Sequence, residues 1–147
     1  MRSPAGVLVR NDVHGLGHFG APRGSRTHIG VDLAIFPRSP VIAPLGGRVS
    51  RIGICYNDDP TFRLVEIKSR GMTHRLLYVS PTVAEDDLLQ EGEQVGLSQD
   101  LRTRYNGIVP HVHWDIMIEG IENKNIPAQD NYKVYFYTNP MALIGLG

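Results

Sequence analysis

Glycine and proline interrupt this chain so often that a long helix is excluded. The sequence has 16 glycines and 10 prolines in 147 residues, and the stretches between them are rich in β-branched and aromatic residues, as in β-strands. We expect helical turns only at residues 84–90 and 139–147, the second capped by Asn139. Strands are expected at residues 40–54, 63–69, 74–81, 111–120 and 133–138. The predicted fold is mostly β, a compact antiparallel sheet or sandwich with short helical turns.

Length and composition limit the other possibilities. A chain of 147 residues fits one domain with its own core. Lysine plus arginine and aspartate plus glutamate both number 15, so the charge pattern does not predict nucleic acid as a partner. The single cysteine, Cys55, has no partner for an internal disulfide. We expect no membrane span and see no signal peptide, so the localisation stays open.

Residues 110–116, PHVHWDI, place a polar group at every second position. Alternate side chains of a β-strand point to opposite faces. One face would carry core residues, namely Val112, Trp114 and Ile116. The other face would carry three groups that can bind or orient a metal, namely His111, His113 and Asp115.

A second candidate segment is THIGVDLAI, in which His28 and Asp32 lie four residues apart. These two side chains could share a metal if the backbone turns near Gly30. Zinc accepts histidine nitrogen and aspartate oxygen, and a catalytic zinc has three protein ligands plus water. Together with one histidine of residues 110–116, this pair would complete such a set. On its own the spacing is common, and most such residues are exposed or hydrogen-bonded.

Several motifs together resemble those of the LytM/lysostaphin-type zinc endopeptidases. The segment HIGVD is similar to their His-x-Gly-x-Asp motif, and PVIAPLGGRV is similar to the Pro-Val-x-Ala-x-x-x-Gly-x-Val that follows it. EGEQVG, PHVHWDI and TNPMALI resemble three further motifs of that family. The run from residue 69 to residue 115 is also similar to animal leukocyte cell-derived chemotaxin, a zinc-binding relative. The resemblance implies a LytM-like (duplicated hybrid motif) domain at 17–147, after a loop-rich segment at 1–16.

The resemblance also implies a site and a substrate. Zinc (Zn²⁺) would be held by His28, Asp32 and His113, and His111 would be a catalytic histidine beside them. Such an ion activates water and polarises a peptide carbonyl. The implied partner is a peptidoglycan peptide rich in glycine or alanine. Asp115 is the natural group to orient His113.

Four further residues are expected near a substrate groove. Tyr78 matches a family tyrosine, and Arg23 flanks the metal motif, where it could contact a substrate carboxylate. Tyr105 and Asn106 precede the strand with the two histidines and could line the groove. For Asn106 a turn is an equal alternative, because Asn-Gly favours tight turns.

The sequence departs from the family at Ser80. Active members have a second catalytic histidine in a Tyr-x-His segment, whereas this chain reads Tyr78-Val-Ser80. His74 cannot replace it along an unbroken strand, because six residues span about 20 Å. Strand alternation places Ser80 on the same side as Tyr78, over the metal. His14 and His18 in the N-terminal segment are the remaining candidates for a substitute.

Two functions therefore stay open. One is a zinc-dependent peptidoglycan endopeptidase, weak if nothing replaces the histidine missing at Ser80. The other is an inactive zinc domain that binds peptidoglycan or a protein, for example as a phage tail or injection-machine component within a larger assembly. The retained His111 favours the first function, and the missing histidine favours the second.

Overall fold

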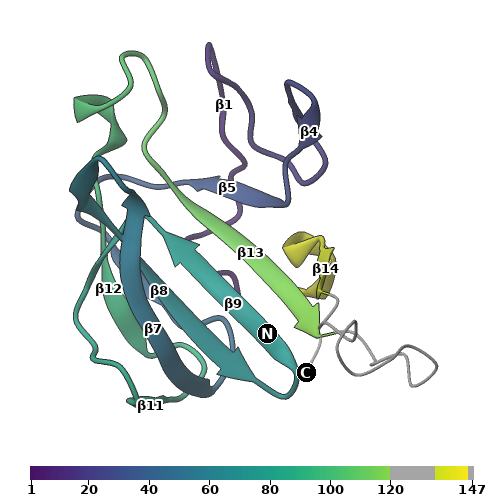
Figure 1. Cartoon of the computed structure of the whole chain (residues 1–147), viewed down its shortest axis with the longest axis vertical. Coiled ribbons are helices and arrows are strands. Elements are labelled where there is room, and N and C mark those ends of the chain that lie inside the picture. The colour runs from purple at the N-terminus through teal and green to yellow at the C-terminus, as the bar shows by residue number, and fades with distance from the viewer. Residues whose placement is uncertain (120–134, 146–147) are drawn as a thin grey trace, which may run out of the picture.

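The computed structural model describes residues 1–119 and 135–145, and its architecture is mostly antiparallel β. The main sheet has the strand order β11-β7-β8-β9-β13-β14, formed by Leu88–Leu89, Gly47–Tyr56, Asp59–Ser69, Met72–Leu77, His111–Glu119 and Tyr135–Thr138. A further strand, β5 (Gly30–Ala34), pairs with the first half of β13. Figure 1 shows this sheet as long curved strands, with β13 running beside β9. The predicted fold class is confirmed.

A smaller sheet packs against the main one. It has the order β10-β12-β6, formed by Val79–Pro81, Gln94–Ser98 and Pro40–Ile42. Buried residues of both sheets form one core, among them Val41, Val65, Val79, Val95 and Trp114. The alternation read from residues 110–116 is correct, because Val112, Trp114 and Ile116 all belong to this core.

Two short hairpins precede β5 and rise above it in Figure 1. They are β1–β2, formed by Asn11–Asp12 and Gly15–Leu16, and β3–β4, formed by Pro22–Arg23 and Arg26–Thr27. The N-terminal segment also contacts β5 directly, through a bridge between Val9 and Leu33. The hairpins therefore stand next to the histidine-bearing end of β13.

The helical content of the described residues is limited to short 3₁₀ turns. One is η1 (Leu101–Thr103), and another is η3 (Pro140–Leu143), where Asn139 accepts a hydrogen bond from the Met141 backbone as expected. The helical turn expected at residues 84–90 is wrong. That segment forms a turn with Asp86 at φ 73° and then enters β11, which pairs with β7. No helix within residues 1–119 and 135–145 has the length and apolar character needed to cross a membrane.

Candidate metal centre and its groove

Three ligand-capable side chains converge where β5 pairs with β13. His113 and Asp32 are directly opposite each other in the β5–β13 pairing, and His28 precedes β5. The Asp32 Oδ1 atom lies 2.9 Å from His113 Nδ1 and 3.2 Å from His28 Nε2. The two histidine nitrogens are 3.1 Å apart. The three residues thus form one cluster that could hold a metal ion, and they are the three that the family resemblance implied; their role as ligands stays a prediction.

The donor set suits zinc in both chemistry and size. A tetrahedral zinc with ligands at 2.0–2.1 Å separates its ligand atoms by about 3.3 Å. The observed separations of 2.9, 3.1 and 3.2 Å are close to that value. All three side chains are buried, which is costly for charged or polar groups without a shared partner. These residues therefore fit a zinc ion.

The second ring nitrogen of each histidine is also paired. His28 Nδ1 lies 3.0 Å from the carbonyl oxygen of His18, and His113 Nε2 lies 2.9 Å from Asp115 Oδ2. A ring nitrogen that donates its proton in this way leaves the other nitrogen free to coordinate a metal. Arg75 in turn donates to both Asp115 oxygens, over 2.8 and 2.9 Å. Asp115, expected as an orienting group, is buried and hydrogen-bonded to His113, as that role requires.

Gly30 lets the two strands come close enough to build this centre. A Cβ atom at this position would lie 2.4 Å from the Trp114 carbonyl oxygen, 2.8 Å from Asp115 Cβ and 2.9 Å from His113 Cε1. His28 and Asp32 come together without a turn at Gly30, because this residue already belongs to β5. Glycine is required here for close strand approach and not for a turn.

Arg10 is a site residue that the sequence reading missed. Its guanidinium donates to Asp32 Oδ2 from Nε over 3.1 Å, and to Asp12 Oδ1 over 2.7 Å. The Arg10 backbone also pairs with β5, because its N–H donates to the Asp32 carbonyl. Only the fold brings this arginine to Asp32, and no local sequence motif indicated the contact.

The boundary drawn between residues 1–16 and 17–147 stays a prediction.

The electrostatics of the cluster favour an ionised aspartate beside histidine. Burial alone would raise the pKa of Asp32, but hydrogen bonds from His113 and His28 lower it below its ordinary value. Burial alone would lower the pKa of His113, but hydrogen bonds to Asp115 and Asp32 raise it to about 9. Without a metal, the His113 ring is therefore protonated between two carboxylates, and a bound cation would replace that proton.

His111 lies beside the three candidate ligands and is not part of their cluster. Its Nδ1 donates to the carbonyl oxygen of Val109 over 2.7 Å, and its Nε2 lies 3.8 Å from Asp32 Oδ2. Burial, with smaller effects from Arg10 and His113, lowers the pKa of His111 although the Asp32 charge opposes this. A neutral ring with Nδ1 protonated leaves a lone pair on Nε2. His111 is therefore set up to accept a proton or a hydrogen bond.

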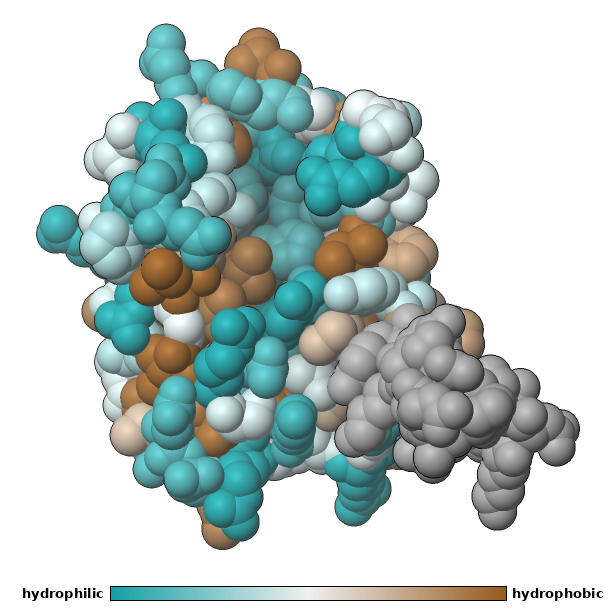
Figure 2. Space-filling model, in the orientation of Figure 1, coloured by the Kyte–Doolittle hydropathy of each residue, from teal (hydrophilic) through white to brown (hydrophobic). Residues whose placement is uncertain are grey.

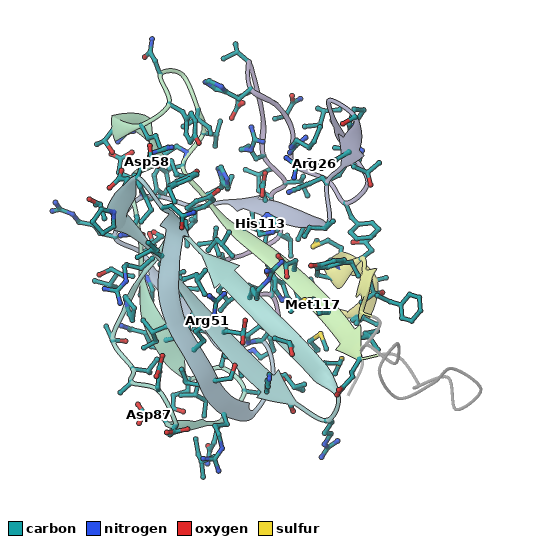
Figure 3. All side chains as sticks on the ribbon, viewed as in Figure 1. Arg26, Arg51, Asp58, Asp87, His113 and Met117 are labelled. Carbon is teal, nitrogen blue, oxygen red and sulfur yellow. The ribbon has the colours of Figure 1, made fainter. Side chains whose placement is uncertain are left out.

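These residues share an open hollow of about 660 Å³. Figure 2 shows hydrophilic side chains around a recess in this part of the surface. In Figure 3, His113 lies between Arg26 on the β3–β4 hairpin and Asp58 in the turn after β7. The lining combines the metal cluster and His111 with arginines and aromatic residues, including Arg10, Arg23, Arg26, His14, Tyr56, Tyr78 and Tyr105.

The residues expected in the groove are only partly brought together. Tyr78, Tyr105 and Arg23 line the hollow, and Arg23 Nη2 lies 3.5 Å from Asp32 Oδ2. Asn106 is instead exposed in a turn, and Gly107 follows with φ 79°. The Asn106 carbonyl oxygen lies 2.6 Å from His14 Nε2.

The placement expected for Ser80 is wrong. Tyr78 has a φ of 70°, and the chain bends there between β9 and β10. This break cancels the strand alternation, so Ser80 is exposed and lines a separate hollow with Thr61 and Gln99. Of the two proposed substitutes, His14 reaches the lining, whereas His18 contributes its carbonyl oxygen to His28.

Comparisons with known proteins identify the family of this chain. Residues 26–126 match the profile of peptidase family M23. Leukocyte cell-derived chemotaxin-2 of Bos taurus is 30% identical over 103 residues, which cover 69% of this chain and 68% of that protein, and the Mus musculus protein gives the same values.

Solved structures of the family share the fold. The catalytic domain of the prophage-encoded M23 protein EnpA from Enterococcus faecalis, solved as a point mutant, has a TM-score of 0.58 and 21% identity, covering 80% of this chain and 88% of that one. Lysostaphin from Staphylococcus simulans, described as an antimicrobial peptidase, has a TM-score of 0.64 and 19% identity, covering 97% and 53%. The profile match spans well over half of the sequence, and this chain belongs to peptidase family M23.

Proposed function

We propose that this protein is a zinc-dependent endopeptidase that hydrolyses cross-link peptides of bacterial peptidoglycan. The observation that carries the proposal is the cluster of His28, Asp32 and His113 in one open hollow with His111. A purely structural metal site is closed by four protein ligands, whereas a catalytic site keeps one position for water or substrate. Three ligands facing a hollow of about 660 Å³ fit the catalytic arrangement.

Hydrolysis adds water across the peptide bond. An oxygen–carbon bond forms at the carbonyl, the carbon–nitrogen bond breaks, and the amine leaves with a proton. A zinc ion in this cluster would activate the water and polarise the carbonyl. His111 presents an unprotonated Nε2 beside the cluster, because its Nδ1 donates to Val109. This ring can take the proton from water and return it to the leaving amine.

The surroundings of the cluster support a small peptide substrate. Arg23 and Arg26 line the hollow on the hairpin side, and because Arg23 already donates to the Leu16 carbonyl over 2.8 Å, the exposed Arg26 supplies the positive charge for a substrate carboxylate. Arg10 is already engaged by Asp32 and Asp12, so it holds the cluster in place and is not free for substrate. The family relatives, which include a prophage-encoded protein and an antimicrobial peptidase, support cell-wall peptides as the substrate class. With such a substrate, the protein would act as part of a virion or of another larger assembly that reaches the cell wall.

The second candidate function is peptide or protein binding without turnover. It is favoured by Ser80, which stands at the family histidine position and lies outside the hollow. The two functions differ in one measurable property, the release of new amino groups.

The deciding experiment incubates zinc-loaded protein with purified peptidoglycan of two kinds, with glycine-rich and with direct cross-links. We expect amino groups to appear with at least one substrate, to stop with a chelator, and to return with zinc. His111→Ala should keep its zinc and lose about 10²–10⁴-fold in rate. No release by a wild type that carries zinc and sediments with peptidoglycan would replace this proposal with the binding function.

A further inference from the structure

Three tyrosines from separate segments meet at one wall of the hollow. Tyr56 ends β7, Tyr78 follows β9, and Tyr105 follows η1. The Tyr105 and Tyr56 hydroxyls are 3.0 Å apart, and the Tyr56 and Tyr78 hydroxyls are 3.1 Å apart. Arg104 Nε lies 3.2 Å from the Tyr105 hydroxyl. Four side chains thus form a continuous hydrogen-bonded chain that ends at Tyr78.

Arg104 fixes the direction of this chain. A guanidinium can only donate, so the Tyr105 oxygen accepts from Arg104 and its proton is available to Tyr56. In the same sense Tyr56 donates to Tyr78. The proton of Tyr78 is then left for an acceptor in the hollow. Hydrogen bonds in a chain polarise one another, which makes a terminal hydroxyl a better donor.

The ring of Tyr78 is held next to the candidate catalytic group. It meets the His111 ring edge-on, with centroids 5.3 Å apart and planes at 88°. Its positive φ of 70° is uncommon for a non-glycine residue and is typical of functional sites. That conformation sends Tyr78 into the metal hollow and leaves Ser80 in another. Burial raises the pKa of Tyr78 to about 12, so its hydroxyl keeps its proton at neutral pH.

We propose that the Tyr78 hydroxyl replaces the histidine missing at Ser80 and donates a hydrogen bond to the carbonyl oxygen of the scissile peptide. This inference rests on the proposed function. Tyr78 keeps its proton throughout, so the hydrolysis described above balances without it. Its effect is to stabilise the negative charge that develops on that oxygen in the transition state. Tyr56, Tyr105 and Arg104 are positioning residues that act through Tyr78.

The test compares Tyr78→Phe with the wild type, both loaded with zinc. Phenylalanine keeps the ring against His111 and removes only the hydroxyl. We expect kcat to fall by about 10²-fold with little change in KM, because loss of one oxyanion donor has this effect. Zinc content and thermal midpoint should be unchanged. Tyr56→Phe should lower kcat by a smaller factor, because Tyr78 keeps its proton and loses only its polarising donor.

Ser50→Ala is the matched control. Its hydroxyl donates to Glu66 Oε1 over 2.9 Å, and Ser50 is on β7 and outside the lining of the hollow. This variant should keep wild-type kcat.

A second readout does not depend on turnover. A phosphinic analogue of a glycine peptide carries tetrahedral oxygens like those of the transition state. Tyr78→Phe should weaken binding of this analogue by about 10²-fold and should hardly change binding of the corresponding unreacted peptide.

The possible outcomes separate the two proposals. Cleavage by the wild type with equal kcat and equal phosphinate affinity in Tyr78→Phe would overturn the role of Tyr78 and leave the endopeptidase function standing. A zinc-loaded wild type that cleaves nothing would overturn the function, and with it the role of Tyr78 in hydrolysis.

Discussion

His113 Nε2 and Asp115 Oδ2 are 2.9 Å apart, on side chains two residues apart in the same strand. This hydrogen bond fixes the ring of His113 so that Nδ1 faces His28 and Asp32. Asp115 is itself held by two hydrogen bonds from Arg75. The strand period of two residues therefore places a candidate metal ligand and the group that orients its ring on the same face.

Asp115→Asn should weaken zinc binding by about 10- to 100-fold, the usual effect of removing an orienting partner. The variant keeps the size of the side chain and removes the carboxylate charge that the His113 ring and Arg75 share. Competition with a chromogenic chelator measures the affinity. Asp86→Asn, at an exposed carboxylate in the turn before β11, is the control and should bind zinc like the wild type. Equal affinities in both variants would show that Asp115 does not orient His113.

Arg10→Met should destabilise the metal-free protein by about 3 kcal/mol, because it removes the buried cation that Asp12 and Asp32 share. Arg10 contacts Asp32 and Asp12, and all three side chains are about 5% exposed. Urea unfolding with and without zinc measures the effect. The loss should be smaller with zinc, since the cation compensates Asp32. Arg26 is an exposed arginine that also lines the hollow. If Arg10→Met lowers the free energy of unfolding no more than Arg26→Met does, the structural role of Arg10 is contradicted.

Ser80→His should not raise hydrolysis, although it restores the residue type of the family motif. The structure sends position 80 into a hollow lined by Thr61 and Gln99, away from the metal cluster. Rates of amino-group release from peptidoglycan, wild type against variant at equal zinc content, test this directly. A chelator-sensitive increase of about 10²-fold would mean that the imidazole reaches the metal and that the bend at Tyr78 does not separate the two hollows.

His74 should make stability depend on pH. Its Nδ1 accepts a hydrogen bond from Trp114 over 3.2 Å, and its ring is fully buried. Burial, against a weaker effect of the Asp115 charge, lowers the pKa of His74 to about 4 from its ordinary value of 6.5. Between these two values the unfolded chain binds a proton that the folded chain does not. Stability therefore rises with pH through this window, by about 3 kcal/mol from this residue.

Urea unfolding of metal-free protein at pH 4.5 and pH 7.5 tests the role of His74. The difference between the two free energies of unfolding should be smaller in His74→Leu than in the wild type. His18→Gln, which changes an exposed histidine, should keep the full difference. An unchanged difference in His74→Leu would mean that the His74 ring titrates normally in the folded protein.

Local patterns predicted the long strands of the main sheet and marked His28 and Asp32 as candidate ligands, whereas the choice of His113 as the third came from the family resemblance. His111, His113 and Asp115 could be placed on one face because β13 is regular and alternates strictly. Regularity fails at Tyr78, whose positive φ has no signal in the sequence, since tyrosine rarely adopts it. The position of Ser80 was therefore predicted on the wrong side. Arg10 could not be predicted at all, because its pairing with Asp32 depends on how the N-terminal segment packs across β5.

The prediction of a helical turn at residues 84–90 was wrong for a different reason. Its acidic and leucine-rich composition is compatible with a helical turn, but the two leucines pair with β7 instead. Asp87 Oδ2 accepts a hydrogen bond from the Ala84 backbone, which closes a tight turn before a helix can form. The Asp87 side chain thus replaces a helical hydrogen bond, and pairing with β7 stabilises the extended conformation of the two leucines.

His28, Asp32 and His113 should together hold one zinc ion, and the proposed function depends on this. The most direct measurement is the metal content of protein purified without chelators and dialysed against trace zinc, for the wild type, His113→Ala and His111→Ala. We expect about one zinc per chain in the wild type and in His111→Ala, and almost none in His113→Ala, because three protein ligands are needed to hold the ion. A wild type that takes up no zinc, or equal zinc in all three proteins, would contradict this assignment.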